Sequence, residues 1–162
     1  MNPTDRLALL HDLYREKLAL FRRHQAGAER VSAYDGNNAY QYVLAREDAH
    51  LEWLRRAIAE AGGTPDDTAA AFTLPSAGAA DLARAVADDD ARTAAAFLAR
   101  WRPRVAAMRH ARDRKMLDLL MGEVAEHQRF FEQVAGGSLE LLGRRPERAG
   151  TGGGVLPGRW VG

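Results

Sequence analysis

The chain has no cysteine, only two lysines and no long uninterrupted apolar run. Without cysteine it has no disulfide, no thiolate-bound zinc or iron–sulfur centre and no cysteine nucleophile, so a metal would have to be bound by His, Asp and Glu. No window approaches ~18 consecutive apolar residues, the length of a membrane-spanning helix. These absences predict a soluble protein with no membrane partner.

An excess of one charge sign is also missing. The 162 residues carry 23 Lys and Arg against 22 Asp and Glu, a net charge of +1. So small a net charge produces no long-range field that attracts DNA, RNA or anionic lipid, and we expect no nucleic-acid partner. Asp5 and Asp12 lie where a secretory signal would be uncharged, which predicts a cytoplasmic location.

Residues that favour strands are scarce. Ile58 is the only isoleucine, whereas 31 alanines favour helices, so the chain is predicted to be all-α. The apolar spacing and the turn signals predict four helices: after Thr4 to Gln25, Asp35 to Ala61, Ala79 to Trp101, and Asp113 to Val134. Gly27 breaks the first of these helices, and Pro103 ends or kinks the third.

The connections between these helices predict the topology. The stretch Thr64 to Gly78 contains Pro65 and Pro75, shows no helical period and exceeds the usual length of a helix–helix loop. A hairpin, a long crossover and a second hairpin make a four-helix bundle of two antiparallel helix pairs. We assign residues 1–143 to this bundle, with room for a further helical turn over 138–143, and residues 144–162 to a Gly-rich C-terminal tail.

Ionisable residues on the apolar helix faces are the candidates for chemistry, because an unpaired buried charge is costly. On the first helix, Glu16 shares its face with Leu13 and Leu20. On the second helix, Glu47 and His50 form a Glu-x-x-His motif, whose i, i+3 spacing lets a carboxylate and an imidazole meet beside the helix. This motif is the sharpest chemical signal in the chain.

The second half of the chain carries a related but altered set of polar residues. Asp89 or Asp90 falls on the inner face of the third helix. On the fourth helix, Glu123 and His127 share an apolar face at i, i+4. Val124 occupies the position that a strict Glu-x-x-His register would give to the carboxylate.

With a polar site on each of four helices, the chain resembles the ferritin-like family of di-iron carboxylate proteins, and most closely its rubrerythrin-like branch. The resemblance covers about residues 4–135 and implies two iron ions, with manganese also suited, that react with O₂ or peroxide in an oxidase or in iron handling. The metal ligands it implies are Glu16, Glu47, His50, Asp90, Glu123 and His127. Aspartate on the third helix and the altered spacing on the fourth depart from the family pattern.

Two other interpretations stay open. A ferritin-like bundle that has lost full metal competence would serve as an interaction or structural module. Alternatively, Glu47, His50 and one or two further acids would hold a single metal ion. The remaining histidines, His11, His24 and His110, lack a paired acid at ligand spacing and are expected at the surface. Whether the chain forms a homo-oligomer is not decided by its sequence.

Overall fold

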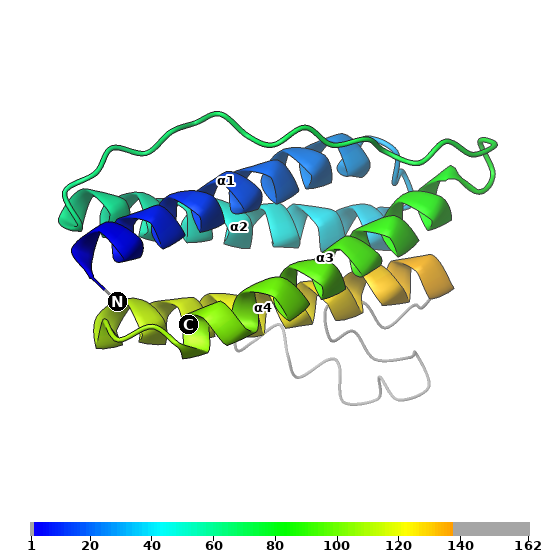
Figure 1. Cartoon of the computed structure of the whole chain (residues 1–162). Coiled ribbons are helices and arrows are strands. Elements are labelled where there is room, and N and C mark those ends of the chain that lie inside the picture. Colours follow the sequence, from blue (N-terminus) through cyan, green and yellow to red (C-terminus); the bar gives the residue numbers. More distant parts are fainter. Residues whose placement is uncertain (1, 138–162) are drawn as a thin grey trace, which may run out of the picture.

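The computed structural model describes residues 2–137, which fold into four long α-helices (Figure 1). They are α1 (Pro3–Ala28), α2 (Tyr34–Glu60), α3 (Leu82–Ala106) and α4 (Ala111–Gly136), and no strand occurs among the described residues. The predicted all-α four-helix bundle is confirmed. The expected turn at 138–143 and the tail at 144–162 lie outside the described residues. Within 2–137, no helix has the length and apolar character needed to cross a membrane.

The helices pair as two hairpins. α1 packs on α2 and α3 packs on α4, and the pairs meet where α2 contacts α4 and α1 contacts α3. Residues 61–81 form the long crossover, which runs back along the outside of α1 before α3 begins (Figure 1). Three hydrogen bonds attach it to α1, since Tyr14 donates to Asp67 Oδ1 (2.5 Å), Arg22 donates to the Asp67 carbonyl (3.1 Å) and Arg23 donates to the Thr73 carbonyl (3.5 Å).

Three helices begin earlier than their sequence signals predict, α2 by one residue at Tyr34, and α3 begins three residues later than predicted, at Leu82. α1 is capped by Asn2, whose side chain accepts from the Asp5 amide at 2.8 Å, so Thr4 lies inside the helix. α4 is capped by His110, whose Nδ1 accepts from the Asp113 amide at 3.2 Å. Asp113, the expected cap, instead accepts from Arg6 Nε at 2.6 Å and so links α4 to the start of α1.

Gly27 does not break α1, and Pro103 does not end α3. α3 continues through Pro103 to Ala106, with Trp101 and Val105 both buried beneath its last turns. α1 likewise continues through Gly27. A Cβ atom at Gly27 would lie only 3.1 Å from a Val86 methyl and 3.2 Å from Asp90 Oδ2, so the missing side chain lets α1 approach α3 closely.

The core consists of two apolar clusters along the bundle axis. The larger contains residues such as Leu10, Leu54 and Trp101, and the smaller contains residues such as Val86 and Phe131. On α1, α2 and α4 buried polar residues fall in the sequence between the two clusters, and on α3 the buried Asp90 lies at the edge of the smaller cluster, directly before Ala91. The bundle therefore holds a polar layer between two apolar ones, and this layer is where chemistry is to be sought.

Candidate functional site

The polar layer draws side chains from all four helices. We define it as the buried residues Lys17, Arg23, His24, Glu47, His50, Asp90 and His127, each at most 7% exposed. The inward placement predicted from periodicity is confirmed for four of these residues, namely Glu47, His50, Asp90 and His127. Their role as metal ligands stays a prediction.

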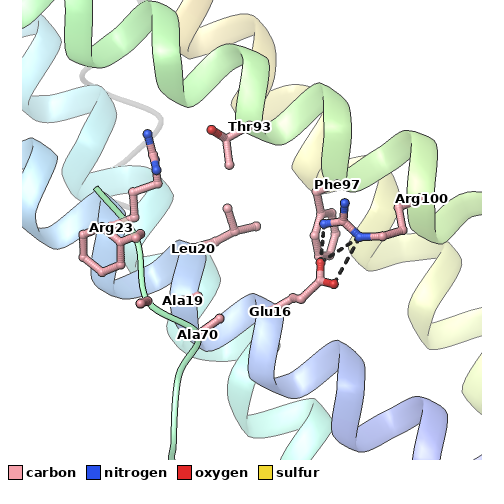
Figure 2. A pocket seen from close by; sticks show the side chains of 10 residues that line it. Glu16, Ala19, Leu20, Arg23, Ala70, Thr93, Phe97 and Arg100 are labelled. Carbon is pink, nitrogen blue, oxygen red and sulfur yellow. Dashed lines mark hydrogen bonds and ion pairs between the residues drawn. The ribbon is translucent and has the colours of Figure 1, made fainter. Parts of the chain in front are cut away.

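Glu16, the predicted ligand from α1, does not join the polar layer. Its side chain is 30% exposed and faces α3, where Arg100 Nη2 lies 2.5 Å from Oε2 (Figure 2). Trp101 Nε1 lies 2.8 Å from the same oxygen. The inward position predicted for Glu16 is wrong, because the buried stripe of α1 runs through Leu13, Lys17, Leu20 and His24 and leaves Glu16 at its margin. The residue that α1 turns inward at this height is its neighbour, Lys17, which is fully buried.

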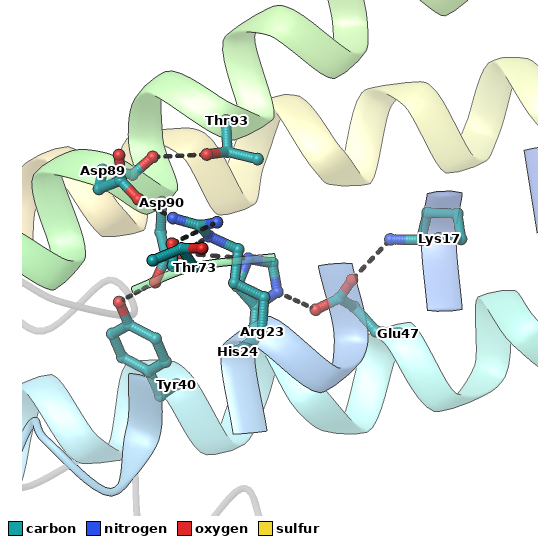
Figure 3. A network of polar contacts seen from close by, with 9 residues as sticks. All are labelled: Lys17, Arg23, His24, Tyr40, Glu47, Thr73, Asp89, Asp90 and Thr93. Atoms are coloured by element: carbon teal, nitrogen blue, oxygen red, sulfur yellow. Dashed lines mark hydrogen bonds and ion pairs between the residues drawn. The ribbon is translucent and has the colours of Figure 1, made fainter. Parts of the chain in front are cut away.

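Glu47 is the centre of the layer and is engaged at both of its oxygens. Lys17 Nζ lies 2.7 Å from Oε2, and His24 Nδ1 bonds to Oε1 (Figure 3). Burial by itself would raise the pKa of Glu47, but the charges of His24 and Lys17 and their hydrogen bonds hold it well below its ordinary value. Glu47 is therefore a carboxylate whose charge is balanced from within the protein.

Sequence reasoning missed both partners of Glu47. His24 was expected at the surface, and that expectation is wrong, because the imidazole is 2% exposed and held between α1 and α2. Lys17 was overlooked because lysine is rarely buried without a partner, and its partner is 30 positions away. A signal existed in the spacing, because Leu13, Lys17, Leu20 and His24 follow one another at four, three and four residues.

Asp90 forms a second centre and is the acid of α3 that faces the core, whereas the Asp89 side chain is 27% exposed. Arg23 Nε lies 2.8 Å from Asp90 Oδ1, and Tyr40 donates its hydroxyl to Oδ2 at 2.5 Å (Figure 3). Burial and the adjacent carboxylate raise the pKa of Tyr40 far above its ordinary value, so the phenol stays protonated. His24 Nε2, 3.9 Å from Asp90 Oδ1, connects the two centres.

His50, His127 and Glu123 form a third group where α2 meets α4. His50 Nε2 lies 3.2 Å from Glu123 Oε2, and the two imidazoles stack with centroids 5.9 Å apart. Arg46 Nε lies 2.5 Å from Glu123 Oε1, and the Glu123 side chain is 18% exposed. Burial lowers the pKa of His50 to about 4 and that of His127 to about 3, so both rings are neutral at pH 7.

These contacts decide how well the layer suits the predicted pair of metal ions. Among residues 2–137, no three His, Asp or Glu side chains gather as ligands around one point. The four predicted carboxylates, Glu16, Glu47, Asp90 and Glu123, are each paired with a Lys or Arg. At the height of Glu47, α3 contributes the ring of Phe97, 5.9 Å from Lys17 Nζ, where the family pattern needs an acid. In this arrangement the residues do not fit a di-iron centre.

Two buried nitrogens in this region lack a hydrogen-bond partner among the described residues: His24 Nε2 and His50 Nδ1. In neutral His50, Nε2–H donates to Glu123 and Nδ1 carries a free lone pair. An imidazole oriented in this way by a carboxylate is the usual form of a metal-binding histidine. The His50 group therefore retains some capacity for a single ion.

Comparisons with known proteins assign the chain to no family, since no family model matches it and no curated protein or solved structure shows significant similarity. The ferritin-like resemblance therefore depends on the residues and spacings of this chain alone.

Proposed function

We propose that this chain is a metal-independent four-helix bundle that acts as a binding module, and that its polar layer maintains the bundle without a di-iron centre. The observation that carries the proposal is the fully buried Lys17 ammonium, 2.7 Å from the Glu47 carboxylate. The positive charge that metal ions would supply beside Glu47 is supplied by the protein itself.

The energetics support this interpretation. A buried carboxylate costs several kcal/mol unless a cation and hydrogen bonds offset its desolvation. Lys17 and His24 meet that requirement for Glu47, and Arg23 and Tyr40 meet it for Asp90. A metal pair held by Glu47 would lie close to the Lys17 ammonium and would be repelled by it. The internal pairs also give the layer one preferred helix register, because only that register joins every charge to its partner.

A second candidate function is the binding of one transition-metal ion by His50, through Nδ1, and His127, with Glu123 orienting the His50 ring. It is favoured by the neutral imidazoles and by the free lone pair of His50 Nδ1. Such an ion would supply Lewis-acid or redox chemistry at the edge of the layer.

Metal analysis of the protein, purified from iron-supplemented cells and dialysed without chelator, separates these functions. Our proposal expects a metal content near zero per chain and a melting temperature that does not rise with added Fe²⁺, Mn²⁺ or Zn²⁺. About one ion per chain, lost in His50→Gln and in His127→Gln, would establish the second candidate. About two ions per chain, lost in Glu47→Gln, would overturn the proposal in favour of the di-iron centre.

Lys17→Met tests whether the Lys17 ammonium excludes metal ions, because it removes the charge and keeps a long apolar side chain. If Lys17 keeps metal ions away from Glu47, this variant should bind Fe²⁺ more tightly than the wild type. Circular dichroism would show that its helices remain. Equal Fe²⁺ affinity in the two proteins would contradict the role given to Lys17, and Arg100→Gln serves as a control for loss of a positive charge elsewhere.

A further inference from the structure

The middle of the crossover, residues 64–77, covers one side of the bundle with very few bonds, and we call it the strap (Figure 1). Among the described residues, the strap makes no backbone–backbone hydrogen bond, whereas a helix bonds its residues to one another along its length. None of the strap residues is buried. A segment of this kind has little stability of its own and is held by whichever side chains attach it to the helices.

Asp67 provides most of the attachment. Its carboxylate accepts from the Tyr14 hydroxyl at 2.5 Å, and its carbonyl accepts from Arg22 Nη2 at 3.1 Å. The third bond, from Arg23 Nη1 to the Thr73 carbonyl, is long at 3.5 Å, and the same guanidinium is engaged by two aspartates of α3. Without the bonds of Asp67, the strap would keep only this weak attachment to α1.

The bond between Tyr14 and Asp67 can open at little cost. Tyr14 is fully buried, but its hydroxyl also accepts from Arg55 Nε at 3.0 Å and so keeps a partner when Asp67 leaves. Asp67 is exposed, and water can replace the hydroxyl at its carboxylate. Opening this bond therefore leaves no buried polar group without a partner.

The strap spans a hollow rather than resting on a filled surface. A pocket of about 360 Å³ lies between the strap, α1 and α3, with residues 70–72 on its outer side. Leu20 of α1 and Phe97 of α3 belong to its lining (Figure 2) and to the larger apolar cluster. Phe72 is 39% exposed, and Ala69 is the one strap residue that packs against that cluster. Apolar contact therefore adds little to the three hydrogen bonds.

We propose that the strap is a detachable cover of the groove between α1 and α3, and that Asp67 is the contact that holds it closed. On release, residues 64–77 leave as a unit while the four helices stay folded, because the strap contributes almost nothing to their core. Opening removes the outer wall of the pocket and uncovers Leu20 and Phe97. Use of the opened groove for binding rests on the proposed function, whereas the release itself does not.

Spin labels test the release directly, because the chain has no cysteine of its own. Double electron–electron resonance measures the distance between nitroxides at Ala71→Cys on the strap and Ala45→Cys on α2, both exposed positions. We expect one narrow distance distribution with Asp67 intact. Asp67→Ala should add a second, broader one, with the ratio of released to docked strap raised at least ~10-fold. Asp66→Ala is the matched control, since the Asp66 carboxylate accepts from the Thr68 amide within the strap.

Chymotrypsin gives a second measurement without labels. Phe72 is the one aromatic residue of the strap, and cleavage after it follows the population of released strap when opening and closing are fast. Asp67→Ala should be cut at least ~10-fold faster than the wild type, and Asp66→Ala at the wild-type rate. Tyr14→Phe removes the same bond from the side of α1 and should be cut faster as Asp67→Ala is.

Three results would overturn the proposal: identical distance distributions with and without Asp67→Ala, a broad distribution already present with Asp67 intact, or equal cleavage of the two aspartate variants. A label pair on the helices, Ala45→Cys with Ala96→Cys, should keep one distance in every variant. A change in that distance would show that the helices move with the strap, and would also overturn the proposal. Metal content is measured separately, so a strap that stays docked leaves the metal-independent function untouched, and bound metal leaves the release untouched.

Discussion

The two hairpins each place a glutamate and a histidine on one helix face, yet they treat the glutamate differently. In the first hairpin Glu47 is fully buried and its partners, Lys17 and His24, come from the helix beside it. In the second hairpin Glu123 is 18% exposed, and its cation, Arg46, comes from α2 of the other hairpin. A carboxylate in the core thus requires buried partners, whereas one at the edge is served by a surface arginine and water.

The spacing of the two motifs explains the difference. His50 follows Glu47 by three residues, whereas His127 follows Glu123 by four. One residue corresponds to a rotation of about 100° around the helix axis. The position three residues before His127 is taken by Val124, which is buried, so Glu123 is displaced toward the edge between α2 and α4. The two hairpins therefore share a glutamate and a histidine on one helix face but differ in how deeply the glutamate is buried.

The largest loss of stability is expected from breaking the buried Lys17–Glu47 ion pair. Glu47→Ala leaves Lys17 without a carboxylate in the core, and we expect it to lower the free energy of unfolding by about 3–5 kcal/mol. Glu123→Ala, its counterpart in the second hairpin, should lower it by only about 1 kcal/mol. Urea denaturation followed by circular dichroism measures both. Equal losses in the two variants would show that the hairpins do not differ in the way described.

Acid should destabilise the bundle through two of its buried histidines, His50 and His127. The unfolded chain takes up these protons near pH 6.5, whereas the folded protein holds the pKa of His50 at about 4 and that of His127 at about 3. Stability is therefore complete above pH 6.5 and falls as the pH drops below it, by roughly 2 kcal/mol per histidine at pH 5. Melting temperatures between pH 7 and 5 measure this slope.

Glutamine substitutions assign the acid sensitivity to one hairpin or the other. His50→Gln and His127→Gln should each remove about half of the pH dependence, since each deletes one of two similar contributions. His11→Gln, away from the polar layer, is the control. A pH slope that survives in the double variant His50→Gln/His127→Gln would place the sensitivity elsewhere.

Two tyrosines of α2 allow a buried and an exposed hydroxyl contact to be compared, with smaller expected losses of stability. Tyr40→Phe removes the hydroxyl that donates to buried Asp90 and should cost about 1–2 kcal/mol, because that carboxylate loses a donor it cannot replace with water. Tyr42→Phe removes a 3.3 Å contact to Glu126 at the surface and should cost less than about 0.5 kcal/mol. Thermal denaturation of both variants in the same buffer gives the comparison, and similar losses would contradict it.

A small and salt-dependent effect is expected at the Arg46–Glu123 pair. Arg46→Ala should change the free energy of unfolding by less than about 1 kcal/mol, and the change should shrink as salt is added, because this pair is partly exposed. The Glu47→Ala loss should be nearly independent of salt, because its pair is buried. Parallel denaturation in 0.05 M and 1 M NaCl measures both, and a salt-insensitive Arg46 variant would contradict the assignment of Glu123 to the edge.

Much of the fold follows from local patterns in the chain. The alanine content, the helical spacing of leucines and the Pro-containing crossover predicted four helices in two hairpins, because helix formation depends on neighbours three and four residues apart. Helix ends were less well predicted at Asn2, His110 and Pro103, where capping contacts and packing outweigh the local signal.

The inward positions of Glu47, His50 and His127 were also determined by the sequence, since periodicity alone places a side chain on a helix face. Which partner each of them meets was decided only by the tertiary structure. Lys17 reaches Glu47, and Glu16 turns to Arg100, because the rotation and the axial register of one helix against another choose between adjacent residues. Those two quantities arise from packing across the whole bundle, and no local stretch of sequence contains them.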